Sequence, residues 1–289
     1  MASLKEIKGR IASVRSTRKI TSAMKMVAAA KLHRAQREIG ALVPYARELQ
    51  AIVAHLAAGE GVVAIPLAEQ REVGRVTIVG FASNTTFCGA FNNNVGRRIV
   101  ELLASDYAEI GADHRRIVAV GRQLGVDLAR GKVPFEAVDE ELANKPNYLA
   151  YRVLAEELIK DFVEGRTDRV VVVYHKFLSA GRQTLVAETL LPIELPEGDS
   201  GPTEGPDYIL EPSREELIAT IVPRQVALRL FTAALSSVAS EHAARMVAMQ
   251  AATENADELI AELSLEYNKQ RQQAITTELL DMMGGKIGS

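Results

Sequence analysis

Neither proline nor glycine interrupts the sixty residues from Arg224 to Met283, RQVALRLFTAALSSVASEHAARMVAMQAATENADELIAELSLEYNKQRQQAITTELLDMM. All 20 glycines and 10 prolines of the 289-residue chain lie elsewhere. Inside a helix a glycine costs about 1 kcal/mol and a proline about 3 kcal/mol. Their absence therefore predicts one continuous helix, which at 1.5 Å per residue would run for about 90 Å.

Apolar and small residues recur along this helix at alternating steps of three and four. They are Leu228, Phe231, Leu235 and Val238, followed by Met249, Ala252, Ala256, Leu259 and Leu263. This spacing is typical of a coiled-coil seam, which the polar residues His242 and Arg245 interrupt. A helix with such a seam needs a partner.

The first segment supplies that partner. Residues 2–57 also have a helical pattern, broken only by Gly9, Gly40 and Pro44. A first seam consists of Leu4, Ile7, Ile11 and Val14, and a second of Ala35, Ile39, Leu42, Ala46, Leu49, Val53 and Leu56. We expect the two terminal helices to pair antiparallel, with opposing residue numbers summing to about 270 because both rise equally per residue.

Charge supports this pairing. The first helix carries eleven Lys or Arg against three Glu, a net charge of +8, and the last carries an acidic block at Glu254, Asp257, Glu258, Glu262 and Glu266. The register places Arg10–Arg18 opposite residues 252–260. Three other interpretations of the basic helix remain open: a transit peptide, an arm for a membrane surface or a nucleic acid, and a solvated coiled-coil face.

The middle of the chain predicts an α/β domain. Val76–Phe81, Arg116–Val120 and Arg169–Tyr174 are typical of buried strands, Val186–Ile193 of a further strand, and Phe91–Ile110 and Tyr148–Glu164 of helices. Such alternation favours a mostly parallel, Rossmann-like sheet. We therefore expect residues 1–57 and 212–289 to form an antiparallel coiled-coil shaft, residues 75–193 an inserted α/β domain, and residues 194–211 a Pro/Gly-rich linker.

Composition excludes several classes. The net charge is only −3, so the chain as a whole has no nucleic-acid footprint. No uninterrupted apolar run approaches 18 residues, so we expect no inserted membrane span. Cys88 is the single cysteine, which rules out an internal disulfide and fits a reducing compartment.

Catalytic motifs are missing. No G-x-G-x-x-G follows the first strand and no G-x-x-x-x-G-K-[ST] occurs, so we expect neither ATP hydrolysis nor tight ATP binding by the isolated chain. Cys88 follows the first predicted strand, where α/β enzymes place a nucleophile, but a lone cysteine is more commonly buried and inert. The histidines show no metal spacing (His33, His55, His114, His175 and His242). We expect no catalytic residue, no cofactor and no metal.

Three stretches resemble the gamma subunit of F-type ATP synthase. They are IASVRSTRKITSAMKMVAA at Ile11–Ala29, SEHAARMVAMQAATENA at Ser240–Ala256 and YNKQRQQAITTE at Tyr267–Glu278. The stretch Asp207–Glu216 and the turn Cys88–Asn92 also fit. The family usually has Asp-Arg-Gly-Leu where this chain has Asn84-Thr85-Thr86-Phe87, and the single cysteine excludes the regulatory pair of chloroplast members, which favours a bacterial type.

The resemblance implies a non-catalytic rotor shaft inside a ring of alpha and beta subunits. The inserted domain would rest on the membrane c-ring and hold the epsilon subunit, peripheral to the cytoplasmic face of the plasma membrane. Proton flow would turn the shaft, and the catalytic beta subunits would respond. The implied partner contacts are Met24, Lys25, Arg245, Arg271, Gln272, Ile275, Thr276 and Leu279. Met24 and Arg245 are equally compatible with simple seam packing.

The predicted register indicates which part of the last helix has no partner. The first helix should run out opposite residues 265–269, leaving Ile275, Leu279, Leu280, Met282 and Met283 without an intramolecular partner. Such a tip in water would be an association site. Two other function classes remain: an α/β enzyme with a coiled-coil arm, which needs a ligand site, and a coiled-coil adaptor, which binds without alpha and beta subunits.

Overall fold

The computed structural model of the protein describes residues 3–58, 65–194 and 210–284. Its residues form two compact units: residues 1–29 with 245–289, here called the shaft unit, and residues 30–244, the domain unit. The elements in chain order are α1 (Leu4–Ala58), η1 (Pro66–Ala68), β1 (Val76–Phe81), α2 (Phe91–Ala104), η2 (Ala112–His114), β2 (Arg115–Val120), α3 (Arg122–Arg130), β3 (Ala137–Asp139), α4 (Glu140–Asn144), α5 (Tyr148–Val163), β4 (Arg169–Ser179), β5 (Arg182–Leu191) and α6 (Arg214–Gly284).

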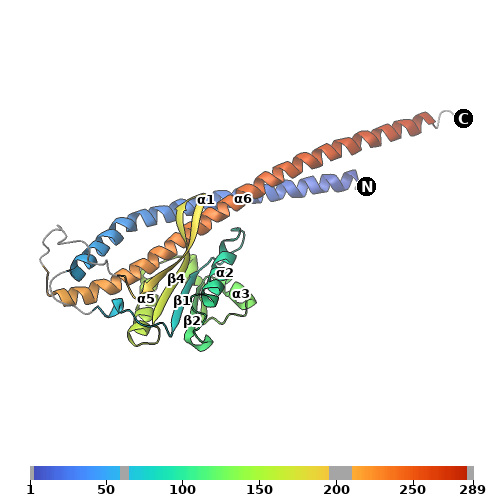
Figure 1. Ribbon diagram of the computed structural model, residues 1–289. Coiled ribbons are helices and arrows are strands. Elements are labelled where there is room, and N and C mark those ends of the chain that lie inside the picture. Colours follow the sequence, from blue (N-terminus) through green and yellow to red (C-terminus); the bar gives the residue numbers. More distant parts are fainter. Residues whose placement is uncertain (1–2, 59–64, 195–209, 285–289) are drawn as a thin grey trace. The chain divides into compact units, whose positions relative to one another are not determined.

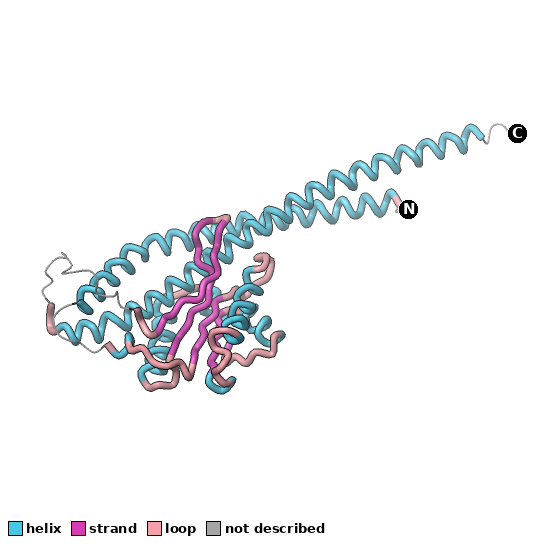
Figure 2. Tube along the Cα trace, viewed as in Figure 1, coloured by secondary structure: helices cyan, strands magenta, loops and turns pink. Residues whose placement is uncertain are grey.

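A five-stranded sheet in the order β3-β2-β1-β4-β5 forms the centre of the domain unit (Figure 2). The four strands β3, β2, β1 and β4 are parallel, whereas β5 returns antiparallel beside β4. This confirms the prediction of a mostly parallel, Rossmann-like α/β sheet. The sequence did not reveal β3, because three residues are too few to show a periodic pattern.

Alternating side chains of the strands pack into two separate hydrophobic cores. Val76 and Ile78 of β1 face a core made with α2 and α3. Val79 and Phe81 of the same strand face a second core, which includes α5 and the domain-unit parts of α1 and α6. Helices therefore cover both faces of the sheet (Figure 1). This explains why β1 is buried at all six positions and has no polar alternation.

The terminal helices belong to the core of the domain unit. Leu56 of α1 and Leu230 of α6 are fully buried in the same core as Phe162 of α5. Arg214, at the start of α6, donates from Nε to the carbonyl of Leu56 (2.6 Å) and from Nη2 to that of Ala57 (3.2 Å). These bonds satisfy carbonyls that the end of α1 leaves without an intrahelical partner.

The hairpin of β4 and β5 extends further than the sequence indicates. The predicted strand ends at Tyr174, but β4 continues to Ser179 and β5 begins at Arg182. The extension is fastened to α6, where Ser236 Oγ accepts from the Phe177 amide (2.8 Å) and Ser240 Oγ donates to the His175 carbonyl (2.9 Å). Hydroxyls on a distant helix support this extension, so strand propensity alone could not predict it.

In the shaft unit the two helices run antiparallel, with the start of α1 and the end of α6 on the same side of the unit (Figure 1). Ile7 and Ile11 of α1 form a buried cluster with Leu263 of α6, and Val14 and Tyr267 pack against it. This confirms the predicted antiparallel pairing of the N- and C-terminal helices.

The register in the shaft unit differs from the prediction by about one helical turn. Thr21 Oγ1 lies 2.8 Å from Thr253 Oγ1, and Arg18 Nε lies 2.5 Å from Asp257 Oδ1. The residue numbers of these pairs sum to 274 and 275 instead of about 270. Leu259, expected in the seam, is 39% exposed. The expected sum assumed a loop position, whereas side-chain packing sets the register.

Both long helices pass through a proline. Pro44 lies inside α1, as predicted, and α6 begins at Arg214, ten residues before the stretch without Pro or Gly, and includes Pro223. By length and composition α6 also contains one stretch apolar enough to cross a membrane, and half of that stretch is buried in the fold. A buried core helix meets the same criterion. Most of the predicted linker 194–211 lies outside the described residues.

Candidate interaction surfaces

The free end of α6 presents uncovered apolar side chains. Ile275, Leu279, Leu280 and Met282 are exposed, with exposed fractions that rise from 47% at Ile275 to 65% at Met282. The last apolar contacts of the shaft unit with α1 involve Leu263 and Tyr267, opposite Ile7 and Ile11. Beyond that point no described segment of the shaft unit covers the apolar face of α6. A partner that covered these side chains would gain roughly 1 kcal/mol or more for each of them.

Polar candidates lie around the start of this tip on the same helix. Arg271, Gln272 and Thr276 are all exposed. Thr276 Oγ1 donates to the Gln272 carbonyl (2.9 Å), so its hydroxyl is turned toward its own helix. Arg271 has no ion pair among the described residues of the shaft unit. Its guanidinium is therefore available for an acceptor on another chain.

The candidates near the start of α1 occupy intermediate positions. Met24 and Lys25 are half-buried, whereas their neighbours Met26 and Val27 are more than half exposed. Ile20, one turn before Met24, is also exposed. The seam pattern does not include these residues, so it could not predict this second apolar patch. Apolar residues at positions outside the seam are the signal that could have revealed it.

Arg245 is buried, with 9% of its surface exposed. It belongs to the shaft unit, whose α6 segment also carries Thr253 and Asp257. Burial favours a packing role within the fold for Arg245 over direct contact with another subunit. His242, the other polar residue that interrupts the seam, is equally buried and belongs to the domain unit.

The loop after β1 is a hydrogen-bonded turn in which Cys88 is structural. The thiol is 1% exposed, and Asn92 Nδ2 donates to Sγ (3.3 Å). Asn92 Oδ1 accepts from both the amide and the hydroxyl of Ser83. Phe87 precedes the cysteine with φ of 63° and two-thirds of its surface exposed. The thiol is thus held as a small core group, in line with the inert role favoured by its sequence context.

Asn84 stands where the gamma subunits that the chain resembles usually have Asp, and its side chain makes two hydrogen bonds. Its Oδ1 accepts from the amide of Arg122 at the start of α3 (2.9 Å), as a helix-capping carboxylate would. Its Nδ2 donates to the carbonyl of Glu140 (2.7 Å), which a carboxylate could not do. The amide therefore ties the β1 loop to both α3 and α4 without a charge.

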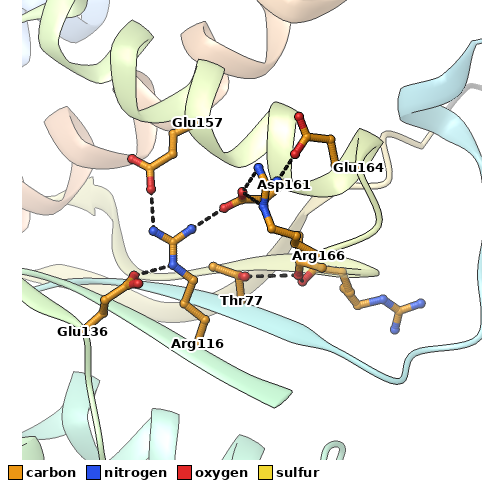
Figure 3. A network of polar contacts seen from close by, with 9 residues as sticks. Thr77, Arg116, Glu136, Glu157, Asp161, Glu164 and Arg166 are labelled. Atoms are coloured by element: carbon orange, nitrogen blue, oxygen red, sulfur yellow. Dashed lines mark hydrogen bonds and ion pairs between the residues drawn. The ribbon is translucent and has the colours of Figure 1, made fainter. Parts of the chain in front are cut away.

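A branched ion-pair network braces α5 against the sheet (Figure 3). Arg116 of β2 binds Glu136, Glu157 and Asp161, and Asp161 also binds Arg166 (2.6 Å). Burial opposes the charged form of Arg116, but its hydrogen bonds to Glu157 and Glu136 outweigh this and raise its pKa. Because the side chains of Arg116 and Asp161 are largely shielded from water, the network fixes structure and offers no open site.

His175 is held neutral in the core. Its ring stacks on Phe91 with a centroid separation of 4.4 Å, and Nδ1 is buried without a hydrogen-bond partner. Burial lowers the pKa of His175 to about 4. Within the described residues no group of three His, Cys, Asp or Glu side chains is arranged to hold a metal ion.

Comparison with known proteins assigns the chain to a family. The family described as ATP synthase matches residues 3–286. The ATP synthase gamma chain of Bacteroides thetaiotaomicron is 48% identical, with 99% of this chain and all of that one covered, and that of Trichlorobacter lovleyi is 38% identical over 99% of this chain and 98% of that one.

Solved structures share the fold. A chain from the Euglena gracilis mitochondrial ATP synthase (OSCP/F1/c-ring, rotational state 3) superposes with a TM-score of 0.67 at 19% identity, covering 98% of this chain and 93% of that one. A chain from the central stalk/c-ring structure of the Tetrahymena thermophila enzyme gives 0.57 at 20% identity, covering 81% and 99%. This chain therefore belongs to the family of ATP synthase gamma chains, the non-catalytic subunit of the central stalk.

Proposed function

We propose that the shaft unit turns inside a ring of alpha and beta subunits and couples proton flow through a membrane c-ring to the catalytic beta subunits. The uncovered apolar tip of α6, Ile275 to Met282, carries the proposal. A helix end with that much exposed apolar surface needs a surrounding partner. An apolar sleeve also suits rotation, because it lacks directional bonds that would hold one angle.

The polar candidates then make contacts that differ between rotational states. Arg271, Gln272 and Thr276 lie at the base of the tip, and Met24 and Lys25 lie on α1 in the same unit. The exposed residues Met26 and Val27 extend the α1 surface. We assign Arg245 a weaker role in partner binding than the others, because it is buried.

The remaining partners follow from the family. The inserted α/β domain would hold the epsilon subunit and rest on the c-ring, at the cytoplasmic face of a bacterial plasma membrane. The chain would be peripheral to this membrane, since half of the apolar stretch of α6 is already buried within the fold. No nucleic acid is part of the assembly.

Co-expression with the alpha and beta subunits tests the proposal. The double substitution Ile275→Asp with Leu279→Asp should strongly reduce recovery of this chain with the ring, because each carboxylate would have to be desolvated in the sleeve. Leu149→Asp with Val153→Asp is the matched control, since it changes two exposed apolar residues four positions apart on α5 of the domain unit, outside the tip. Circular dichroism of the isolated chains should show equal helix content for all three proteins.

The opposite result would overturn the assignment. If the doubly substituted chain assembles and supports ATP hydrolysis and proton pumping at wild-type rates, the tip is a frayed helix end. If even the wild-type chain fails to purify with alpha and beta subunits, this result supports the interpretation as a coiled-coil adaptor.

A further inference from the structure

The domain unit contains a cavity that the shaft function does not use. It has a volume of about 430 Å³ and lies between α1, the β4–β5 hairpin and α6. Small-molecule pockets in proteins typically span roughly 300–1,000 Å³. The cavity therefore has room for a ligand of several non-hydrogen atoms.

Two buried polar atoms of the cavity wall have no hydrogen-bond partner. They are Gln225 Oε1 and Thr232 Oγ1, both on α6. Buried polar groups in native proteins nearly always have a hydrogen-bond partner, so we expect a water molecule or a ligand to bind these two atoms. The two residues are seven positions apart, which places them on the same side of the helix with roughly 10 Å between their Cα atoms.

The positive and negative side chains that line the cavity are equal in number, and most of them already have a hydrogen-bond partner. Glu188 accepts from the Tyr174 hydroxyl (2.9 Å) and from Lys176 Nζ (3.4 Å). Arg229 Nη2 donates to the Thr189 carbonyl (3.0 Å). Lys176 and Arg229 are matched by Glu188 and Glu194, so the lining carries no net charge. An ion of either sign would meet charges of both signs there, so it would lose its hydration without a net electrostatic gain.

Part of the cavity wall is apolar and lies beside these charged side chains. Leu228 lies on α6 between Gln225 and Thr232, and Ala233 and Ile193 also line the space. An occupant with a hydrocarbon middle would match this surface. Its ends would have to carry hydrogen-bonding groups, because only those satisfy the two oxygens.

We propose that this cavity is a binding site for an elongated, uncharged small molecule that carries a hydrogen-bond donor at each end. One end binds Gln225 and the other binds Thr232, while the middle packs on Leu228. The occupant contacts α1, α6 and the hairpin together, so it would hold these three elements against one another. This inference does not depend on assembly with other subunits.

The probe 1,6-hexanediol tests the site on the isolated full-length chain. Methyl NMR resonances of Thr232 and Leu228 should shift and saturate, with a dissociation constant on the order of 1 mM for a ligand with so few non-hydrogen atoms. Adipate, which has the same length but a charge at each end, should bind at least about tenfold more weakly. 1-Hexanol, which lacks one hydroxyl, should bind about fivefold more weakly, as expected for one lost hydrogen bond.

A nearly isosteric double substitution, Gln225→Leu with Thr232→Val, should weaken diol binding about tenfold or more. The matched control, Gln250→Leu with Thr220→Val, makes the same chemical changes on α6 away from the cavity and should leave binding unchanged. Shifts that stay linear with concentration, or that are equal for the diol, the alcohol and adipate, would show that only water occupies the cavity and would overturn the proposal. The ligand comparison on the wild type decides the question even if the double variant misfolds.

Discussion

The buried histidine in β4 makes the stability of the domain unit dependent on pH. Burial lowers the pKa of His175 to about 4, against 6.5 for an ordinary histidine. The unfolded chain therefore binds a proton between pH 6.5 and 4 that the folded chain does not bind. The stability contributed by neutral His175 is thus fully present above pH 6.5 and is lost as the pH falls through this window.

The size of the effect follows from the two pKa values. Linkage of one proton with these values lowers the free energy of unfolding by about 2 kcal/mol between pH 7.5 and pH 5.0. The limit below pH 4 is on the order of 3 kcal/mol. Such a loss is a considerable fraction of the stability of a typical domain.

Urea unfolding followed by tyrosine fluorescence can measure this, because Tyr107, Tyr151 and Tyr174 are buried in the domain unit and the chain has no tryptophan. Carboxylates add their own pH dependence, so the comparison is with His175→Gln, which should lack the 2 kcal/mol component. His114→Gln, at an exposed position, is the matched control and should behave as wild type. If wild type and His175→Gln lose equal stability between pH 7.5 and 5.0, the reasoning is refuted.

Three further predictions concern packing. In a Cys88→Ser background, Thr21→Cys with Thr253→Cys should form a disulfide within one chain faster than Ile11→Cys with Leu259→Cys, because the hydroxyls of Thr21 and Thr253 lie 2.8 Å apart. Gel mobility under non-reducing conditions measures the two rates of crosslinking. The reverse order of rates would contradict the observed register. Arg116→Ala should lower the free energy of unfolding by about 3 kcal/mol, because it leaves shielded carboxylates with fewer partners. Arg130 is exposed, so Arg130→Ala should lower this free energy by under about 0.5 kcal/mol in the same urea titration. Gly121→Ala should lower the free energy of unfolding by about 3 kcal/mol or more, because φ is 102° and the added Cβ would lie 2.2 Å from the Ala82 carbonyl oxygen. A Cβ added at Gly181 meets nothing within 4 Å, so Gly181→Ala is the control. Equal melting temperatures for the two variants would contradict this explanation.

The sequence by itself determined the architecture, since long seams, uninterrupted helices and apolar strands each reflect local physical preferences. Ile7, Ile11 and Leu263 lie in the predicted seam, and β1 has the predicted bounds. The family followed from motifs at both ends of the chain. The exposed apolar tip was also predictable, because a difference in helix length leaves one end without cover.

Only the tertiary structure decided how these elements fit together. The one-turn register shift that pairs Thr21 with Thr253 depends on side-chain packing along two helices, which spacing within one helix does not specify. The extension of β4 past Tyr174 depends on hydroxyls of α6 that lie some sixty residues away in the chain. The roles of Asn84 and Arg116, and the unpartnered oxygens of Gln225 and Thr232, likewise arise between elements distant in sequence. Local patterns determine which elements form, whereas contacts between them determine register, burial and the chemistry of each cavity.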